Sequence, residues 1–246
     1  MKVKASIRVP FFEIGVKNYI YGDDVLRLAL AADKAAARYD IDVLFIAPYA
    51  DIRRIADHTE HLIIFAPYMD TLRPGRGMAD VLPESVCAAG ARGVVINHCE
   101  RPMTLPAIRL TMERAQELEL LTFICADTPT EINAAAQFLP DIINPEPTEL
   151  IGTDQTSSMD YVRQTVESIR RIAPHTLVEQ AAGIRSGQQV YQNICAGADG
   201  TGAASGIVTA PFPCAMAEEM IFYTRKAKDD LCKLQRRSYE NSSGII

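Results

Sequence analysis

Ionisable and polar residues follow a short apolar run within residues 93–105, which read GVVINHCERPMTL. The apolar part predicts a buried strand. Directly after it come His98, Cys99, Glu100 and Arg101. A histidine can act as an acid or a base near neutral pH, and a nearby carboxylate can orient it. The cluster is either part of a reaction centre or the polar end of an ordinary strand. Taken by itself, a histidine in the position of His98 is more often a hydrogen-bonded structural residue, which favours the second interpretation.

Cys99 suggests a nucleophile beside His98, but neighbouring residues at the end of a strand tend to point apart. A Cys–His pair is therefore not expected. The six cysteines include no C-x-x-C pair, and most lie in apolar surroundings. This usage indicates reduced thiols in a cytoplasmic protein rather than disulfides or a zinc site.

Glu146 is a second candidate, in the segment NPEPTELIGT after another apolar run. Such a carboxylate is either a surface charge in a rigid turn or a general base on a loop that closes over substrate. Prolines stiffen the start of the segment, and Gly152 and Thr153 allow movement at its end. Glu149 lies further into the loop, where we expect it to be solvated.

Lys17 follows the apolar residues FFEIGV, where it is either a solvated lysine or a ligand for an anionic substrate. Small residues dominate two later segments, 180–187 and 197–206, and would let backbone N–H groups approach a phosphate. The G-T-G at 200–202 lies too late in the chain for a dinucleotide fingerprint and lacks its third glycine. An NAD-dependent oxidoreductase is therefore disfavoured, and a small-residue packing turn is the plain alternative.

The elements that must position these residues alternate along the chain. Strands are expected at about 11–16, 42–49, 62–67, 93–98, 120–126, 141–146, 176–181 and 198–204. Most are almost continuously apolar, which is typical of parallel strands covered on both faces.

Segments with helical spacing lie between the strands. Examples are Ile108, Met112, Ala115 and Leu118, and then Val162, Val166, Ile169 and Ile172. Asp23 and Asp24 suit the first turn of a helix. Thr104 offers a capping hydroxyl before a helix that has an early proline, Pro106.

Eight strand–helix units in residues 1–246 predict a single-domain (β/α)8 barrel, because no linker or change of composition divides them. A doubly wound open sheet is the alternative. In a barrel the reacting groups lie at the carboxyl ends of the strands, where the candidates above fall. Residues from about 237 to 246 are expected to form a flexible tail.

Charge and hydropathy exclude several classes of partner. The net charge of −6 argues against binding to nucleic acid or to an anionic membrane. No apolar run is long enough for a membrane helix, and the N-terminus lacks the features of a signal peptide. We therefore expect a cytoplasmic protein.

Together these segments resemble the triosephosphate isomerase family, particularly its shorter archaeal-type members. NHCER looks like the family's His-Ser-Glu-Arg motif, EPTELIGT like its catalytic glutamate and lid, and GVK stands where it has Asn-aromatic-Lys. RPG at 73–75 through VLPE at 81–84 resembles the third loop, and AGI at 182–184 and ASG at 204–206 resemble the phosphate loops. The similarity runs in unbroken order over about residues 12–230.

The resemblance implies a TIM barrel and a cofactor-free aldose–ketose isomerase that acts on a small phosphorylated sugar through an enediolate. Triose phosphates, glyceraldehyde 3-phosphate and dihydroxyacetone phosphate, are the default substrates, as in glycolysis. By the family's mechanism Glu146 would take a proton beside a carbonyl, neutral His98 would polarise that carbonyl, and Lys17 would stabilise the negative charge. The helix after residue 104 would keep His98 neutral.

The remaining site residues also follow from the resemblance. Glu100 and Cys99 would support the catalytic groups from behind. Gly15, Gly152, Gly183, Ile184, Ala204 and Ser205 would line the substrate and phosphate site. No metal or organic cofactor is implied.

Several supporting residues depart from the family pattern: Gly15 replaces asparagine, Cys99 serine and Ala181 glycine, Pro67 replaces a polar residue, and Met78-Ala79 replaces the threonine that reaches a neighbouring subunit. These changes leave two alternatives open, an isomerase of another sugar phosphate, such as a four-carbon one, and a phosphosugar-binding paralogue with impaired catalysis. The family assembles through its third loop, so a homodimer or homotetramer is expected.

Overall fold

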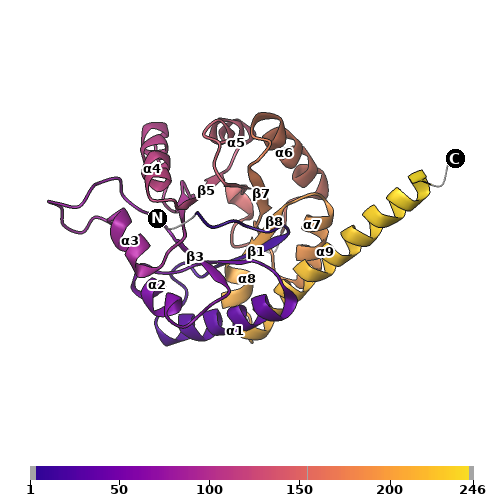
Figure 1. Cartoon of the computed structure of the whole chain (residues 1–246), viewed down its shortest axis with the longest axis horizontal. Helices are drawn as coiled ribbons and strands as arrows, with labels where there is room; N and C mark the ends of the chain where they lie inside the picture. Colours follow the sequence, from indigo (N-terminus) through magenta and orange to yellow (C-terminus); the bar gives the residue numbers. More distant parts are fainter. Residues whose placement is uncertain (1–3, 154, 244–246) are drawn as a thin grey trace.

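The eight expected strands form a closed barrel in the computed structural model, each hydrogen-bonded in parallel to its neighbours in the order β1 to β8 and back to β1 (Figure 1). The structure describes residues 4–153 and 155–243, and side chains as far as residue 234. Closure confirms the (β/α)8 TIM barrel and rules out the doubly wound open sheet, because an open sheet would have two edge strands, each paired on one side only.

The strands are β1 (Phe11–Gly15), β2 (Val43–Ile46), β3 (Leu62–Ala66), β4 (Gly93–Ile96), β5 (Leu121–Ala126), β6 (Ile142–Pro145), β7 (Leu177–Gln180) and β8 (Gly200–Ala203). All eight predicted strands are present, but most end one to three residues earlier than expected. At the carboxyl ends the backbone leaves the extended conformation, with φ of 46° at Lys17 and 60° at Asn97. Residues that look like strand continuations therefore belong to the mouth of the barrel.

The helices are α1 (Asp23–Tyr39), α2 (Tyr49–Ala56), α3 (Pro83–Ala89), α4 (Leu105–Glu117), α5 (Pro129–Ala136), α6 (Met159–Ile172), α7 (Gly187–Cys195), α8 (Ser205–Val208) and α9 (Pro213–Ser243), with a 3₁₀ turn η1 (Thr148–Leu150). The Thr104 hydroxyl accepts a hydrogen bond from the Ala107 N–H, so the predicted cap of α4 is present. The chain is helical as far as Ser243, so 237–243 is not irregular coil, and 244–246 lies outside the described residues. Flexibility of this tail stays a prediction.

Aromatic and aliphatic side chains from the strands fill part of the barrel interior. Phe11, Leu44, Phe65 and Phe123 pack together from four different strands, and each is almost fully buried. Gly200 makes room for them, because a Cβ there would lie 2.3 Å from the Phe11 ring. The glycines at 200 and 202 are thus strand residues rather than a packing turn.

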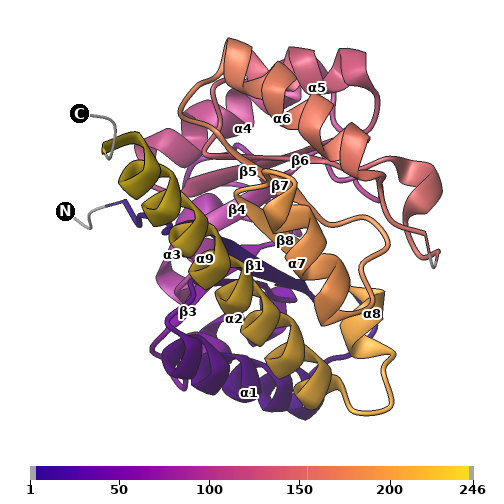
Figure 2. The ribbon, with the colours of Figure 1, turned by 90° about the vertical axis from the view of Figure 1, so that its right-hand side faces the viewer.

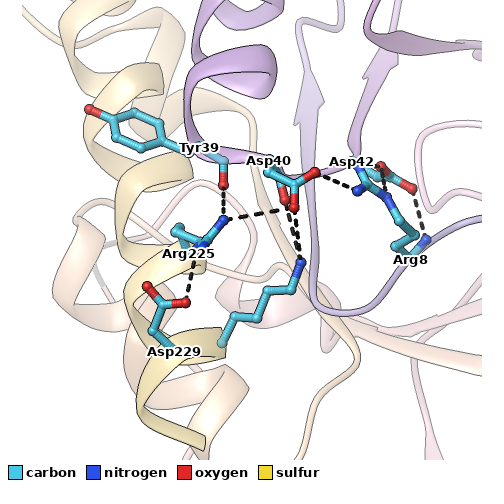
Figure 3. Close-up of polar contacts among 7 residues, drawn as sticks. Arg8, Tyr39, Asp40, Asp42, Arg225 and Asp229 are labelled. Carbon is cyan, nitrogen blue, oxygen red and sulfur yellow. Dashed lines mark hydrogen bonds and ion pairs between the residues drawn. The ribbon is translucent and has the colours of Figure 1, made fainter. Parts of the chain in front are cut away.

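The long helix α9 completes the ring of helices, since it packs between α1 and α7 and then extends past the barrel (Figure 1). Ion pairs fix it to the end of the barrel where the strands begin (Figure 3). The carboxylate of Asp40 forms ion pairs with Arg8, Arg225 and Lys228. Arg8 also forms an ion pair with Asp42. The amino-terminal segment, the turn after α1 and α9 are therefore joined at one end of the barrel.

The opposite end carries the loops that follow the strands. Figure 2 shows α8 and the loop between β6 and α6 at this end, away from the amino terminus. Because all strands are parallel, the residues that follow them converge here. Among the described residues, no helix has the length and apolar character needed to cross a membrane.

Candidate active site

Glu146 and His98 face one another across the mouth of the barrel. Glu146 follows β6, His98 follows β4, and the His98 Nε2 atom lies 3.7 Å from Glu146 Oε2. Their side chains are only 11% and 20% exposed. Both line a cavity of about 570 Å³, so a small molecule bound there would touch an imidazole and a carboxyl group at once.

A turn of backbone fixes the imidazole ring of His98. The Glu100 N–H donates to His98 Nδ1 at 3.1 Å, and the Arg101 N–H donates to the His98 carbonyl at 2.7 Å. Because Nδ1 accepts, the proton of a neutral ring is on Nε2, the atom that faces the cavity. Burial, helped by the charge of Lys17, lowers the pKa of His98, so the ring is neutral near pH 7.

The expected support from the helix after residue 104 is not what the structure shows. Helix α4 begins at Leu105, and its hydroxyl cap at Thr104 bonds to Ala107, within the same helix. The N–H group that holds His98 comes instead from the tight turn at residues 98–101. A turn this close to the ring provides the hydrogen bond directly.

The carboxyl group of Glu146 has the pKa of a base suited to neutral pH. Burial raises its pKa to about 7, and the charges of Glu100 and Asp127 act in the same direction, while Lys17 opposes them. The Glu146 N–H bonds to the Ala126 carbonyl at 2.9 Å, which fixes the residue to the end of β5. A carboxylate with this pKa takes up protons more readily than a solvated one.

Lys17 is held over the cavity by Glu100. Its Nζ atom donates to Glu100 Oε1 at 3.0 Å. Burial acts to lower the pKa of Lys17, but the hydrogen bond and charge of Glu100, together with Glu146, outweigh it, and the net shift is upward. Lys17 is therefore a permanent positive charge beside Glu146 and His98. Glu100 supports both neighbours, through its side chain to Lys17 and its backbone to His98.

Residues expected around a phosphate meet at the same mouth. The cavity lining includes Gly15, Gly152, Gly183, Ile184, Ala204 and Ser205. Gly183 cannot be replaced without movement, because its φ is 70° and an added Cβ would lie 1.9 Å from the Gln155 carbonyl oxygen. The loop after β6 therefore rests directly on the loop after β7.

The loop after β6, which the sequence led us to expect as a lid, is held by local hydrogen bonds. Its first part is the turn η1, in which Glu149 is exposed, as predicted. The Thr148 N–H bonds to Asp127 Oδ1 at 3.2 Å, and Thr153 Oγ1 donates to the Leu150 carbonyl at 2.8 Å. Residue 154 lies outside the described residues.

A family model described as triosephosphate isomerase matches residues 14–208, most of the barrel. The chain belongs to the triosephosphate isomerase family. This confirms the resemblance drawn from the motifs, and membership makes the chain an isomerase, an enzyme that moves hydrogen within one molecule.

Individual members of the triosephosphate isomerase family align over nearly their whole length. The triosephosphate isomerase of Methanobacterium bryantii is 35% identical over 209 residues, which cover 83% of this chain and 92% of that protein. That of Methanoculleus marisnigri is 33% identical over 86% of this chain and 97% of its own length. That of Sulfurisphaera tokodaii is 30% identical over 91% and 99%.

Cys99 stands where the triosephosphate isomerase motif has serine. It is exposed and does not line the cavity, but its sulfur contacts His98 Nδ1 at 3.8 Å, so the expectation that the two side chains point apart is wrong. Partial burial of the thiol group, followed by the charge of Glu146, raises the pKa of Cys99, so it is a thiol rather than a thiolate near pH 7. The structure thus supports the view that Cys99 is not a nucleophile.

Asn97 has a role that the sequence did not reveal. Its side chain donates to the Cys125 carbonyl at 3.0 Å and accepts from the Met103 N–H at 2.8 Å. With a φ of 60°, it turns the chain sharply just before His98. Asparagine tolerates this conformation better than most residues, which is the signal that was available in the sequence.

Two further parts of the lining were also missed. One side wall contains Tyr49 and Tyr68, and Arg101 lies over the Tyr68 ring at 4.6 Å. The floor contains Glu13 and Asn144, polar residues inside strands that otherwise look apolar. Only closure of the barrel shows that they reach the cavity.

Proposed function

We propose that this enzyme interconverts dihydroxyacetone phosphate and glyceraldehyde 3-phosphate through an enediolate. The observation that carries the proposal is the pairing of a carboxyl group of pKa about 7, Glu146, with a neutral imidazole, His98, in one cavity. A proton that leaves a carbon beside a carbonyl needs this combination, a base on the carbon and a hydrogen-bond donor on the oxygen.

In the proposed reaction the Glu146 carboxylate removes a proton from carbon 1 of dihydroxyacetone phosphate. The electrons of the C–H bond form a carbon–carbon double bond, and those of the carbonyl move onto its oxygen. The Nε2–H of His98 and the charge of Lys17 stabilise that oxygen. Return of the proton from Glu146 to carbon 2, with a proton shift between the oxygens through His98, gives the aldehyde. No external oxidant or reductant is needed.

The phosphate is proposed to lie against the loops after β6, β7 and β8. Backbone N–H groups of Gly152, Ile184, Ala204 and Ser205 are the proposed donors. Closure of the loop after β6 would exclude water and keep Glu146 basic during the reaction. We place the enzyme in the cytoplasm, on the basis of its cysteine usage.

The proposal is tested by following isomerisation and exchange of the substrate α-proton with D₂O by NMR. Replacement of Glu146 by glutamine keeps the size of the side chain but removes the base, so turnover should fall by at least about a thousandfold. Glu149→Gln is the matched control, since Glu149 is an exposed glutamate of the same loop, and it should change turnover by less than about threefold.

Tight binding of a triose phosphate without proton exchange would contradict the proposal and favour a phosphosugar-binding paralogue. Equal losses in Glu146→Gln and Glu149→Gln would show that the loop, rather than the carboxylate of Glu146, is needed for turnover.

A further inference from the structure

Two buried glutamates lie inside the barrel and take no part in the proposed proton transfer. Glu13 belongs to β1 and is 5% exposed, and Glu179 belongs to β7 and is fully buried. Strand β8 lies between these two strands in the barrel. Two carboxyl groups inside one core are unusual, because an ionised carboxylate is costly to bury unless it has a partner.

Gly202 of β8 brings the two carboxyl groups together. It is paired in register with Glu13, and a Cβ at residue 202 would lie 2.2 Å from Glu13 Oε2 and 2.4 Å from Glu179 Oε1. Since both distances are measured to one point, the two oxygens lie within about 5 Å of one another, a range in which one negative charge strongly disfavours a second. Any side chain at residue 202 would collide with both carboxyl groups.

The two carboxyl groups lack the partners that an ionised carboxylate requires. Among the residues whose side chains are described, none hydrogen-bonds Glu13 Oε1 or either carboxyl oxygen of Glu179. The charge of Lys17 acts on Glu13, but Lys17 forms its ion pair with Glu100 instead. A buried carboxyl group without hydrogen-bond donors or a paired cation favours its protonated form.

The pKa values of both groups are raised accordingly. Burial, followed by the charge of Glu146, raises the pKa of Glu13 well above its usual value, and the charge of Lys17 opposes this only in part. Burial, followed by the charges of Glu13 and Glu146, raises the pKa of Glu179. Burial also raises the pKa of the Cys125 thiol in β5, which is therefore uncharged near pH 7. The two glutamates thus hold their protons against the charge of an ionised Glu146.

We propose that Glu13 and Glu179 form a proton-holding pair that stays protonated while Glu146 is ionised, and that ionisation of the pair at higher pH slows the isomerisation. The proposal rests on the proposed function, since Glu146 is the base in that reaction. The pair acts through its charge rather than by contact with substrate, because its carboxyl oxygens without partners are not accessible. Both glutamates are therefore positioning residues for the electrostatics of the site.

A protonated pair leaves the floor of the cavity neutral when negative charge develops on the substrate oxygen. Lys17 and His98 then stabilise that oxygen without opposition from below. Loss of a proton from the pair would place a negative charge near the enediolate and destabilise it. The rate should therefore fall at high pH, although His98 stays neutral there and the pKa of Lys17 is raised above its usual value.

Infrared spectroscopy tests the protonation directly, without a substrate. The C=O stretch of a protonated carboxyl group is separate from the bands of a carboxylate. At pH 8 the wild type should show this band, Glu13→Gln and Glu179→Gln should each lose part of it, and the double variant should lose both parts. The wild-type band should shrink between pH 8 and pH 10, a measurement that holds even where a variant fails to fold. Absence of the band from the wild type at pH 8 would overturn the proposal.

The kinetic test follows kcat/KM for dihydroxyacetone phosphate as a function of pH. In the wild type kcat/KM should fall by at least about threefold between pH 8 and pH 10, as the pair loses its first proton. In the double variant Glu13→Gln/Glu179→Gln this fall should largely disappear, because amides do not ionise. An equal fall in the wild type and in the double variant would overturn the link between the pair and the reaction.

Gln180→Met is the matched control, since Gln180 is the next residue of β7, is almost fully buried, and donates from its amide to Thr165 of α6. This variant disturbs the same strand but should keep the high-pH fall of the wild type. Loss of the fall in Gln180→Met as well would show that packing of β7, rather than the pair, controls it, and would overturn the proposal. A wild type that isomerises no triose phosphate at any pH would instead overturn the proposed function, while the infrared band would still decide on the pair.

Discussion

At the scale of single residues, three charged groups set one another's behaviour. Glu100 holds Lys17 by an ion pair of 3.0 Å, and Lys17 in turn lowers the pKa of Glu146, which burial has raised. The base is thus balanced between two opposing influences. Its pKa depends on the lysine as well as on its own burial.

The first prediction concerns the titration of Glu146. In the free enzyme its ¹³C-labelled carboxyl group should titrate with a midpoint near the value of about 7. Below that pH the base is protonated, so kcat/KM should fall as pH decreases. Lys17→Met removes the opposing positive charge, so the midpoint should move to higher pH. A midpoint between 4 and 5 in the folded wild type would contradict the assignment.

The second prediction concerns Glu179. Burial and the charges of Glu13 and Glu146 raise its pKa in the folded protein. A carboxyl group of this kind stabilises the fold fully below its unfolded pKa, and that stabilisation is lost as pH rises above it. Glu179→Gln removes this dependence of stability on pH. The Tm of the variant minus the Tm of the wild type should therefore be larger at pH 8 than at pH 5, by about 3 °C for each kcal/mol of unfolding free energy that the wild type loses between these pH values. The same Tm difference at both pH values would contradict this account.

Residue types at the site were predictable, but their contacts were not. The motifs predicted His98, Glu146 and Lys17. The hydrogen bond that orients His98 was not predictable, because it depends on the geometry of a tight turn. Glu13 is a single polar residue in an apolar strand, FFEIG, and alternation alone did not show which face it occupies. Closure of the barrel, which brings distant strands together, determines which face such a residue occupies.

At the scale of elements, glycines in the strands make room for aromatic rings inside the barrel. A Cβ on Gly93 of β4 would lie 2.2 Å from the Phe65 ring of β3. That ring packs edge-on against Phe123, with centroids 6.2 Å apart, so it has little room to move. The strands end early for a related reason. Residues at the mouth of the barrel, such as Asn97, leave the extended conformation and belong to the loops that form the site.

The third prediction tests this packing. Gly93→Ala should lower the free energy of unfolding by about 1–3 kcal/mol, the usual cost of overpacking a core, as measured by urea denaturation. Phe65→Leu gives the new methyl group space, so the double variant should be more stable than the sum of the two single losses implies. Simple additivity would show that the contact between residues 93 and 65 does not limit stability.

At the scale of the whole molecule, the loop between β3 and α3 projects from the barrel (Figure 1). Its base is closed by Asp70, which exchanges two hydrogen bonds with Val81, and its tip carries Met78, 93% exposed. This is the loop that resembles the family's third loop, through which we expect copies of the chain to associate. Closure of the barrel and the order of its units were predictable from alternation alone, whereas the way copies associate was not, because the tip differs from the family pattern.

The fourth prediction is that the protein is a homodimer or homotetramer. Light scattering at micromolar concentration should give two or four times the chain mass of 27.1 kDa. Met78→Asp places a charge at the tip of the loop and should shift the mass toward the monomer. Phe212→Asp changes another exposed apolar residue, outside this loop, and should not. Wild-type particles of one chain mass only would refute the prediction.

The ion pairs around Asp40, drawn in Figure 3, lie at the end of the barrel where the strands begin, whereas Glu146 and His98 follow the carboxyl ends of β6 and β4. Chemistry and anchorage are thus placed on opposite ends of one barrel. A tether attached near Arg8, or along the far part of α9, would hold the enzyme on a support with its mouth open to solution. Immobilised molecules would then all present the cavity in the same direction, and diffusion of substrate to it would be unobstructed.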